Sequence, residues 1–188
     1  MADRADTGRV AVLAPGGNYG ADGPLLLFSS VAARRRGAAA HPLTWEPERE
    51  EEAHAMVGRT VAAALDEEAA EDVVVFGKSL GSMAAPVIAE RGLPAVWFTP
   101  LLTDTAVVAA LRSAAGPCLL AGGTADPYWD GEIARSVTPH VVEVDGADHL
   151  MFVPGGLAAS AAVLGDVMTA VERFLDDVAW TTAGPGVS

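Results

Sequence analysis

The chain has 188 residues, a length that suits one domain, and 51% of them are hydrophobic, so it can bury a sizeable core. Its formal net charge of −13 gives a surface that repels phosphates, so nucleic acid is not an expected partner. The single cysteine, Cys118, rules out an internal disulfide, and no Cys/His cluster has the spacing of a zinc site. We therefore expect no metal site.

The sequence carries no sign of a membrane segment. Residues 1–9 are charged and lack the apolar centre of a signal peptide, and no stretch has the apolar length of a transmembrane helix. We expect a cytoplasmic protein without membrane contact. It is predicted to form one domain over residues 1–180, with a flexible C-terminal tail over residues 181–188. The sequence leaves a homo-oligomer open.

Short apolar segments alternate with helix-like segments along the chain. In chain order, the predicted strands cover residues 9–14, 41–45, 72–76, 94–98, 117–121 and 140–144. The predicted helices cover residues 24–36, 50–68, 79–91, 104–113, 128–136 and 157–178. Such alternation indicates βαβ units and a sheet covered on both faces. We predict an α/β fold, a three-layer α/β/α sandwich with a mostly parallel sheet of about six strands.

Two of these helices carry more detailed predictions. Pro86 lies inside the helix over residues 79–91 and should kink it, because its ring removes one backbone hydrogen bond. The last helix has one apolar stripe at helical spacing, which predicts a face buried in the core. The members of this stripe are Leu157, Ala161, Leu164, Met168, Val171, Leu175 and Val178.

The clearest strand, over residues 72–76, leads into Gly77-Lys78-Ser79-Leu80-Gly81 and then a helix. This is the G-x-S-x-G pattern in the strand–turn–helix context that it requires. Small residues on either side let the chain turn sharply, and the turn lifts the serine hydroxyl to a helix N-terminus, where negative charge is favoured. We predict that Ser79 is a nucleophile. We expect Lys78 to be structural or to flank the pocket.

The same residues also resemble the end of a phosphate-binding P-loop. That motif requires a glycine five positions before Gly77, where this chain has Asp72. The intervening residues 73–76 form a predicted strand rather than a glycine-rich loop, so we expect no nucleotide binding here.

A serine hydroxyl is a weak nucleophile until a base accepts its proton, and histidine is the usual base. His41 and His54 precede Ser79, and His140 begins a predicted strand. His149 follows the last strand and is the base that position favours.

An acid is needed to orient that base. Asp126 follows the preceding strand and gives the order Ser, Asp, His. Asp145 and Asp148 are rivals. Asp148 adjoins His149, and neighbouring side chains in a loop usually diverge, so we prefer Asp126.

The remaining site residues are predicted from their loops. Backbone N–H groups of Leu80 and of Gly17, with Asn18 as the next candidate, should form an oxyanion hole. An ordinary glycine-rich turn explains the loop around Gly17 equally well. Substrate contacts are expected from Asn18, Tyr19, Leu101, Tyr128 and Trp129. For Trp129, packing beneath its own helix is the equal alternative.

With these residues in place, the chain resembles the α/β-hydrolase superfamily over residues 10–178. The resemblance rests on the order of elements, the glycine loop after the first strand, and the positions of Ser79, Asp126 and His149. It implies a minimal α/β-hydrolase fold and hydrolysis of a small ester or related acyl compound through an acyl-enzyme. It implies no cofactor.

The chain looks most similar to the small, lid-less, dienelactone-hydrolase-like members of that superfamily. The Ala14-Pro-Gly-Gly17 turn and the Ala147-Asp-His-Leu-Met151 run suggest this. Two features depart from the family: its first strands are missing here, and serine stands where dienelactone hydrolases have a cysteine. The fold expectation is unaffected, but the substrate stays open.

Other functions would fit the same sequence. A thioesterase, an amidase or an acyltransferase would use the same three residues, and a hydrolase fold can also serve as a non-catalytic binding or scaffold protein. The presence of all three residues in their expected loops favours an enzyme. The short segment over residues 99–103 leaves no room for a lid, so we expect an open site that prefers short acyl chains.

Overall fold

The computed structural model of the chain describes residues 8–45, 52–68, 70 and 72–181. The predicted start of the second helix at residue 50 and the predicted tail from residue 182 onward lie outside these residues.

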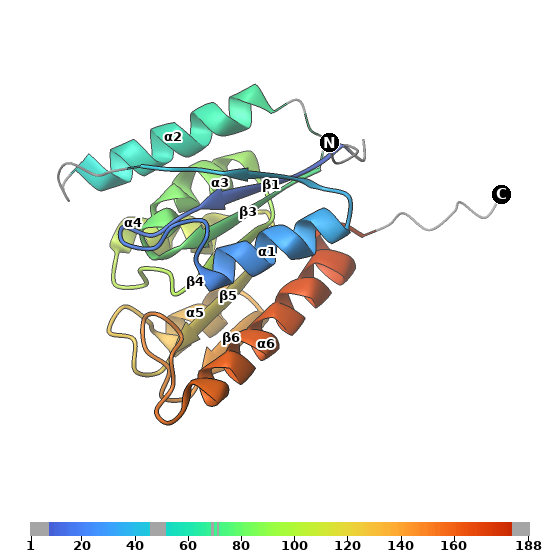
Figure 1. Cartoon of the computed structure of the whole chain (residues 1–188). Helices are drawn as coiled ribbons and strands as arrows, with labels where there is room; N and C mark the ends of the chain where they lie inside the picture. Colours follow the sequence, from blue (N-terminus) through green and yellow to red (C-terminus); the bar gives the residue numbers. More distant parts are fainter. Residues whose placement is uncertain (1–7, 46–51, 69, 71, 182–188) are drawn as a thin grey trace.

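Six strands form one sheet in the order β2-β1-β3-β4-β5-β6, and all neighbours are parallel (Figure 1). The strands are β1 (Arg9–Ala14), β2 (Ala39–Pro42), β3 (Asp72–Lys78), β4 (Ala95–Phe98), β5 (Cys118–Gly123) and β6 (His140–Val144). The predicted sheet of about six strands is confirmed. Because all strands run the same way, the loops after them gather at a single edge of the sheet.

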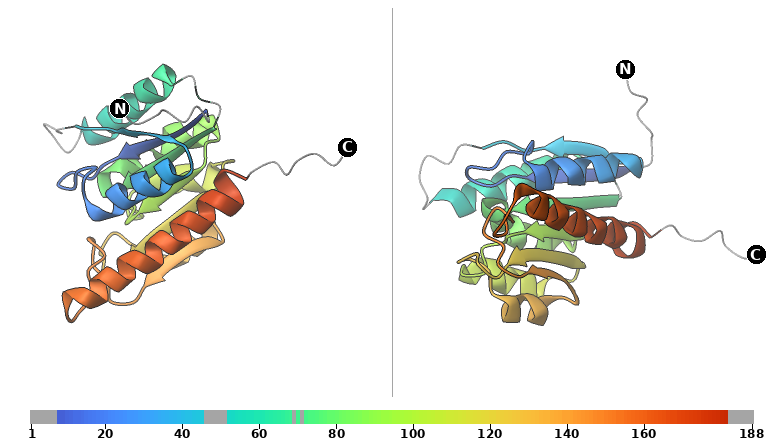
Figure 2. Two further views of the ribbon diagram at one scale, coloured as in Figure 1. Left: turned by 45° about the vertical axis from the view of Figure 1, so that its right-hand side comes forward. Right: turned by 60° about the horizontal axis from the view of Figure 1, so that its bottom comes forward.

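Helices cover both faces of the sheet, which confirms the three-layer arrangement (Figures 1 and 2). They are α1 (Pro24–Arg35), α2 (Ala53–Glu67), α3 (Ala85–Arg91), α4 (Thr105–Ser113), α5 (Gly131–Val137) and α6 (Leu157–Phe174). Helices α2 to α5 bury one face of the sheet, and α1 and α6 bury the other. In β3, Val73 and Val75 belong to the first core, whereas Val74 and Phe76 belong to the second. This strand is therefore apolar on both sides, as a central parallel strand should be.

Two predicted boundaries are displaced for identifiable reasons. Strand β2 covers Ala39–Pro42 rather than 41–45, in register with Val10–Leu13 of β1. Helix α5 begins at Gly131 rather than 128, because the Asp130 carboxylate accepts hydrogen bonds from the backbone N–H groups of Glu132 and Ile133. A side chain that caps two amides in this way fixes the first turn of a helix.

The helix predicted over residues 79–91 is two segments rather than one kinked helix. Ser79–Ala84 is a 3₁₀ helix (η2), and the α-helix α3 begins only at Ala85. Pro86 therefore lies in the first turn of α3, where a backbone N–H has no partner within the helix and proline is tolerated.

The apolar stripe of the last helix is only partly buried, which corrects the prediction. Met168, Val171 and Leu175 are buried, but Leu157 is 80% exposed. Figure 2 shows the first turns of α6 extending past the strands, so this end of the helix has no sheet to pack against. Beyond Phe174 the helix continues as a short π-helical segment, η3 (Leu175–Ala179).

Candidate active site

Ser79 lies at a sharp turn between β3 and η2. Its backbone φ is 51°, in the left-handed region that side chains other than glycine seldom adopt. The glycines on either side make the turn possible. A Cβ atom on Gly77 would meet the Trp97 ring, and one on Gly81 would meet the carbonyl of Ala14. The chain therefore needs glycine at both positions to place this serine at the edge of the sheet.

A second serine holds this turn in place. The Ser82 hydroxyl donates to the Ser79 carbonyl oxygen at 2.6 Å and accepts from the Leu101 backbone N–H at 3.1 Å. Ser82 is fully buried. It links the turn to the loop after β4, a connection that the sequence analysis missed because a serine one turn along a helix carries no distinctive signal.

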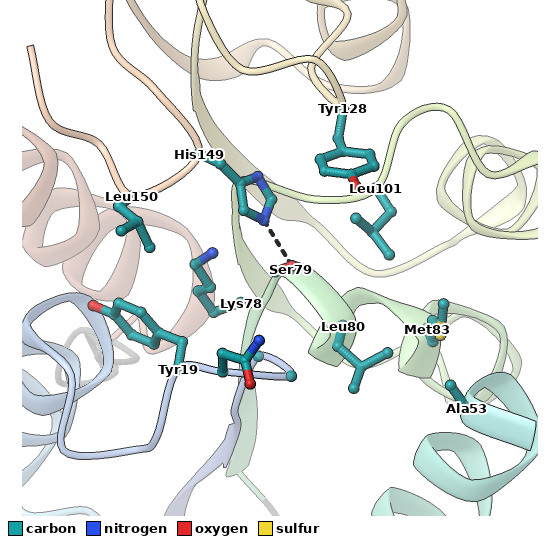
Figure 3. A pocket seen from close by; sticks show the side chains of 13 residues that line it. Tyr19, Ala53, Lys78, Ser79, Leu80, Met83, Leu101, Tyr128, His149 and Leu150 are labelled. Carbon is teal, nitrogen blue, oxygen red and sulfur yellow. Dashed lines mark hydrogen bonds between the residues drawn. The ribbon is translucent and has the colours of Figure 1, made fainter. Parts of the chain in front are cut away.

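Three side chains from separate loops form one hydrogen-bonded chain. His149 Nε2 lies 2.8 Å from Ser79 Oγ (Figure 3). His149 Nδ1 lies 2.8 Å from Asp126 Oδ2. The Asp126 side chain is fully buried and also accepts from the Tyr128 backbone N–H. A proton on Nδ1 that is held by Asp126 leaves Nε2 free to accept from the serine. The Tyr128 ring packs edge-on against the imidazole, with centroids 5.0 Å apart.

The structure also places the two rival acids. Asp148 turns back on its own loop and accepts from the backbone N–H groups of Leu150 and Phe152. Asp145 accepts from the Thr124 hydroxyl at 3.1 Å. Of the three candidate carboxylates, Asp126 is the one that contacts His149. Asp148 instead shapes the loop that carries the imidazole.

These residues lie on a cleft of about 550 Å³ at the carboxyl edge of the sheet. The lining residues are Gly16, Gly17, Asn18, Tyr19, Ala53, Lys78, Ser79, Leu80, Met83, Leu101, Tyr128, His149 and Leu150. Asn18, Tyr19, Leu101 and Tyr128 were predicted to contact substrate, and the structure places all four in this wall. Ala53, Met83 and Leu150 were not predicted, because each comes from an element whose approach to Ser79 depends on tertiary packing.

Trp129 does not line the cleft, which corrects its predicted role. Its ring packs close to Gly122 and against the first core, and its indole N–H donates to Glu143 at 2.8 Å. The backbone N–H of Trp129 donates to the Asp126 carbonyl oxygen, and this turn directs the indole toward the sheet. Of the two alternatives for this side chain, the packed one is what the structure shows.

The two predicted oxyanion-hole residues lie side by side. A Cβ atom on Gly17 would approach the Leu80 side chain to 3.8 Å, and both residues line the cleft beside Ser79. The loop that carries Gly17 is closed by the Gly16 N–H, which donates to the Tyr19 carbonyl oxygen at 2.9 Å. The phenol oxygen of Tyr19 in turn accepts from the Leu25 N–H at the start of α1. The loop is thus fixed at both ends, and its role in oxyanion binding stays a prediction.

Lys78 was expected to be structural or to flank the pocket, and it is a buried wall residue of the cleft. It is only 1% exposed, and its ammonium lies 5.1 Å from the centroid of the Tyr19 ring. Burial lowers the pKa of the Lys78 amine to about 8, although the negative charges of Asp126 and Asp148 act to raise it. Its stem passes Gly16, where a Cβ atom would lie 3.3 Å from Lys78 Cδ.

None of the helices in residues 8–45, 52–68 and 72–181 has both the length and the apolar character needed to cross a bilayer. Within the same part of the chain, no three histidine, cysteine or acidic side chains are grouped so that they could hold a metal ion.

Comparison with known proteins finds similarity in structure rather than in sequence. No protein-family model matches the chain, and no curated protein sequence matches it. Solved structures do match. An α/β serine hydrolase homologue from Coxiella burnetii is 14% identical with a TM-score of 0.67, over 89% of this chain and 85% of that one. A lid-less α/β serine hydrolase from Xanthomonas campestris is 14% identical with a TM-score of 0.66, over 93% and 84%.

A dienelactone hydrolase from Anabaena variabilis is also similar, with 18% identity and a TM-score of 0.64 over 88% of this chain and 84% of that one. At these identities the likeness concerns the fold. The chain therefore has the α/β-hydrolase fold, as the sequence predicted.

Proposed function

We propose that this chain, which has the α/β-hydrolase fold, is a serine hydrolase that cleaves a small ester through an acyl-enzyme. The observation that carries the proposal is the hydrogen-bonded chain from Asp126 through His149 to Ser79, on the wall of an open cleft. A fold alone does not imply a reaction, so the proposal rests on this geometry.

The first half-reaction forms the acyl-enzyme. Ser79 Oγ attacks the ester carbonyl carbon while His149 Nε2 takes the hydroxyl proton, and the resulting imidazolium is stabilised by the buried Asp126 carboxylate. The carbonyl oxygen gains negative charge, which the N–H groups of Leu80 and Gly17 would stabilise. The bond to the leaving oxygen then breaks, and His149 returns its proton to the departing alcohol.

The second half-reaction repeats these steps with water. Water donates a proton to His149 Nε2 and attacks the acyl carbon, and Ser79 leaves with that proton restored. The products are a carboxylic acid and an alcohol, and no cofactor takes part. A thioester would follow the same route, and an alcohol in place of water would give acyl transfer.

The shape of the cleft favours small substrates. The loop between β4 and α4 is short, and Leu101 within it lines the cleft directly rather than leading into a lid. A cleft open to water can cover only a few carbons of an acyl chain, so apolar contact stops increasing early.

Labelling with a fluorophosphonate probe tests the proposal. We expect the probe to modify Ser79, as mapped by peptide mass spectrometry, and Ser79→Ala to abolish labelling and lower ester turnover by on the order of a million-fold. Full labelling or turnover in Ser79→Ala would refute the assignment. A folded wild-type protein that neither reacts nor turns over any ester would point to a binding or scaffold protein.

A further inference from the structure

The side chain of Lys78 is buried, and its ammonium has no strong partner in the protein. Lys78 ends β3, is 1% exposed and lines the cleft, and its ammonium lies over the face of the Tyr19 ring. Among the residues that the structure describes, no carboxylate lies within ion-pair distance of Lys78 Nζ and no oxygen accepts a hydrogen bond from it. An ammonium carries three donors, and a ligand in the cleft can accept from donors that the protein leaves unused.

The nearby carboxylates are directed at other groups rather than at Lys78 Nζ. Asp126 accepts from Tyr128 N–H and contacts His149 at 2.8 Å. Asp148 accepts from two backbone N–H groups of its own loop. The Lys78 ammonium is thus attracted by Asp126 and Asp148 only from a distance. Neither carboxylate accepts a hydrogen bond from its N–H donors.

The position of Lys78 divides the cleft into two ends. Figure 3 shows Lys78, Tyr19 and Leu150 on one side of Ser79, and Leu80, Met83 and Ala53 on the other. We call the first set the cationic end and the second set the apolar end. Leu150 lines the cleft at this end and is 47% exposed.

We propose that the ammonium of Lys78 binds a carboxylate of the substrate, so that the enzyme acts on esters that carry a negative charge close to the scissile bond. This inference rests on the proposed function and narrows its substrate class. A carboxylate would accept the unused N–H donors in a charge-assisted hydrogen bond, which is stronger than a neutral one. The overall charge of −13 repels anions in general, so recognition must come from this local cation.

Two pairs of esters test the proposal, one for each side of the scissile bond. On the acyl side, mono-4-nitrophenyl adipate is compared with 4-nitrophenyl hexanoate, which has the same chain length and no charge. On the leaving-group side, the acetate ester of 4-hydroxybenzoate is compared with that of 4-hydroxybenzamide. The readout is the ratio of kcat/KM for the anionic and the neutral ester, after subtraction of the buffer rate.

The variant is Lys78→Met, which keeps an unbranched side chain and removes the charge. Arg112→Met is its matched control, because Arg112 is an exposed cation on α4 outside the cleft lining. We expect the ratio in one pair to fall by on the order of tenfold or more in Lys78→Met and to stay at the wild-type value in Arg112→Met. Equal loss for both esters, or no change in either pair, would overturn the proposal.

The unmodified protein provides an independent measurement if Lys78→Met fails to fold. Because the pKa of the Lys78 amine is about 8, the preference for the anionic ester should be full at pH 7 and decline as the pH rises through 8 to 9. Tyr19, Asp126, Asp148 and His149 also face this region. The ratio of two esters cancels any effect of pH that is equal for both. A ratio that stays constant from pH 7 to 9.5 would contradict the proposal.

Failure of the proposed function would look different. In that case no ester would be hydrolysed faster by wild type than by Ser79→Ala. Calorimetry with the Ser79→Ala protein, which leaves the esters intact, then decides the inference alone. Tighter binding of the anionic than of the neutral ester in either of the two pairs, lost in Ser79→Ala/Lys78→Met, would support the carboxylate subsite, and equal binding in both pairs would refute it.

Discussion

The cationic end and the apolar end of the cleft offer a ligand different kinds of interaction. At the apolar end, Leu80, Met83 and Ala53 offer only contact area, so their contribution grows with each carbon covered. At the cationic end, Lys78 offers one charge at a fixed point, held by a strand and a tyrosine ring. A substrate with a negative charge on one side and an apolar group on the other would interact favourably with both ends of the cleft. Either end alone would recognise only half of such a substrate.

The largest expected effect distinguishes the two aspartates near the cationic end. Asp126→Asn should lower turnover by about 10,000-fold, because an amide cannot hold the histidine in the tautomer that accepts the serine proton. Asp148→Asn should reduce turnover much less, since this carboxylate holds the loop rather than the imidazole. Steady-state kinetics of the two folded variants on 4-nitrophenyl acetate decides between them, and the reverse ranking would transfer the orienting role to Asp148.

The apolar end should respond to acyl length. In 4-nitrophenyl esters from acetate to palmitate, each methylene that remains covered contributes about 0.8 kcal/mol, or roughly fourfold in kcat/KM. We expect this rise to stop after a few carbons, with no activation by lipid droplets. A rise that continues to palmitate would require a tunnel or a pocket completed by a second copy, and the open-cleft picture would be wrong.

The two ends should also affect stability in opposite directions. The amine of Lys78 has a pKa of about 8 in the folded chain, below its usual 10.5. The folded state therefore binds fewer protons between pH 8 and 10.5, so stability rises with pH across that interval and the destabilisation is complete below pH 8. Lys78→Met should stabilise the protein at pH 7 by up to about 3 kcal/mol, and the gain should shrink toward pH 10.5.

Met83→Ala is the counterpart at the apolar end. Met83 is 9% exposed and belongs to the first core, so its truncation should cost about 2–5 kcal/mol at every pH. Urea unfolding of both variants at pH 7 and pH 10 gives the comparison. If Lys78→Met is less stable than wild type at pH 7, packing of the lysine side-chain carbons stabilises the fold by more than burial of the charge destabilises it.

The smallest effect concerns the neighbouring aromatics at the edge of the cleft. Trp129→Phe should leave kcat/KM within about twofold of wild type and cost roughly 1 kcal/mol of stability, through the hydrogen bond lost to Glu143. Tyr128→Ala should lower kcat/KM, because the Tyr128 ring packs on the imidazole and lines the cleft. Equal losses of kcat/KM in Trp129→Phe and Tyr128→Ala would indicate that Trp129 contacts the substrate after all.

Local patterns were enough to predict the layers and the loop that carries each candidate residue. The apolar run of β3 and the glycines around Ser79 act within a few residues of chain, and the order of strands then brings Asp126 and His149 to the same edge. The catalytic roles of these three residues stay predictions, as does the cytoplasmic location.

Features set by distant packing were not predictable in the same way. Nothing in the sequence says that Lys78 is buried, since a lysine at the end of a strand is usually exposed. Leu150 and Ala53 reach the cleft only because a loop and a helix far apart in the chain meet there. Leu157 belongs to an apolar stripe with helical spacing, yet it lies where the sheet has already ended.

The cores on the two faces of the sheet differ in how far apart along the chain their helices lie, and this difference affects the order of folding. The first core draws its helices from the segment between Ala53 and Val137, so its contacts link elements that follow one another closely. The second core pairs α1 with α6, joined at the far end by the Arg36 guanidinium on Asp176. Contacts between residues so far apart in the sequence form late, and they slow folding.

During synthesis, one side of the sheet must therefore wait for α6. Until that helix leaves the ribosome, apolar side chains such as Phe76, Phe98 and Leu119 lack part of their final cover, and α1 can shield only the strands nearest to it. Exposed apolar strands of this kind are where partly made chains associate with one another or with chaperones. The half of the sandwich that holds the candidate nucleophile turn can thus assemble first, while completion of the fold depends on α6.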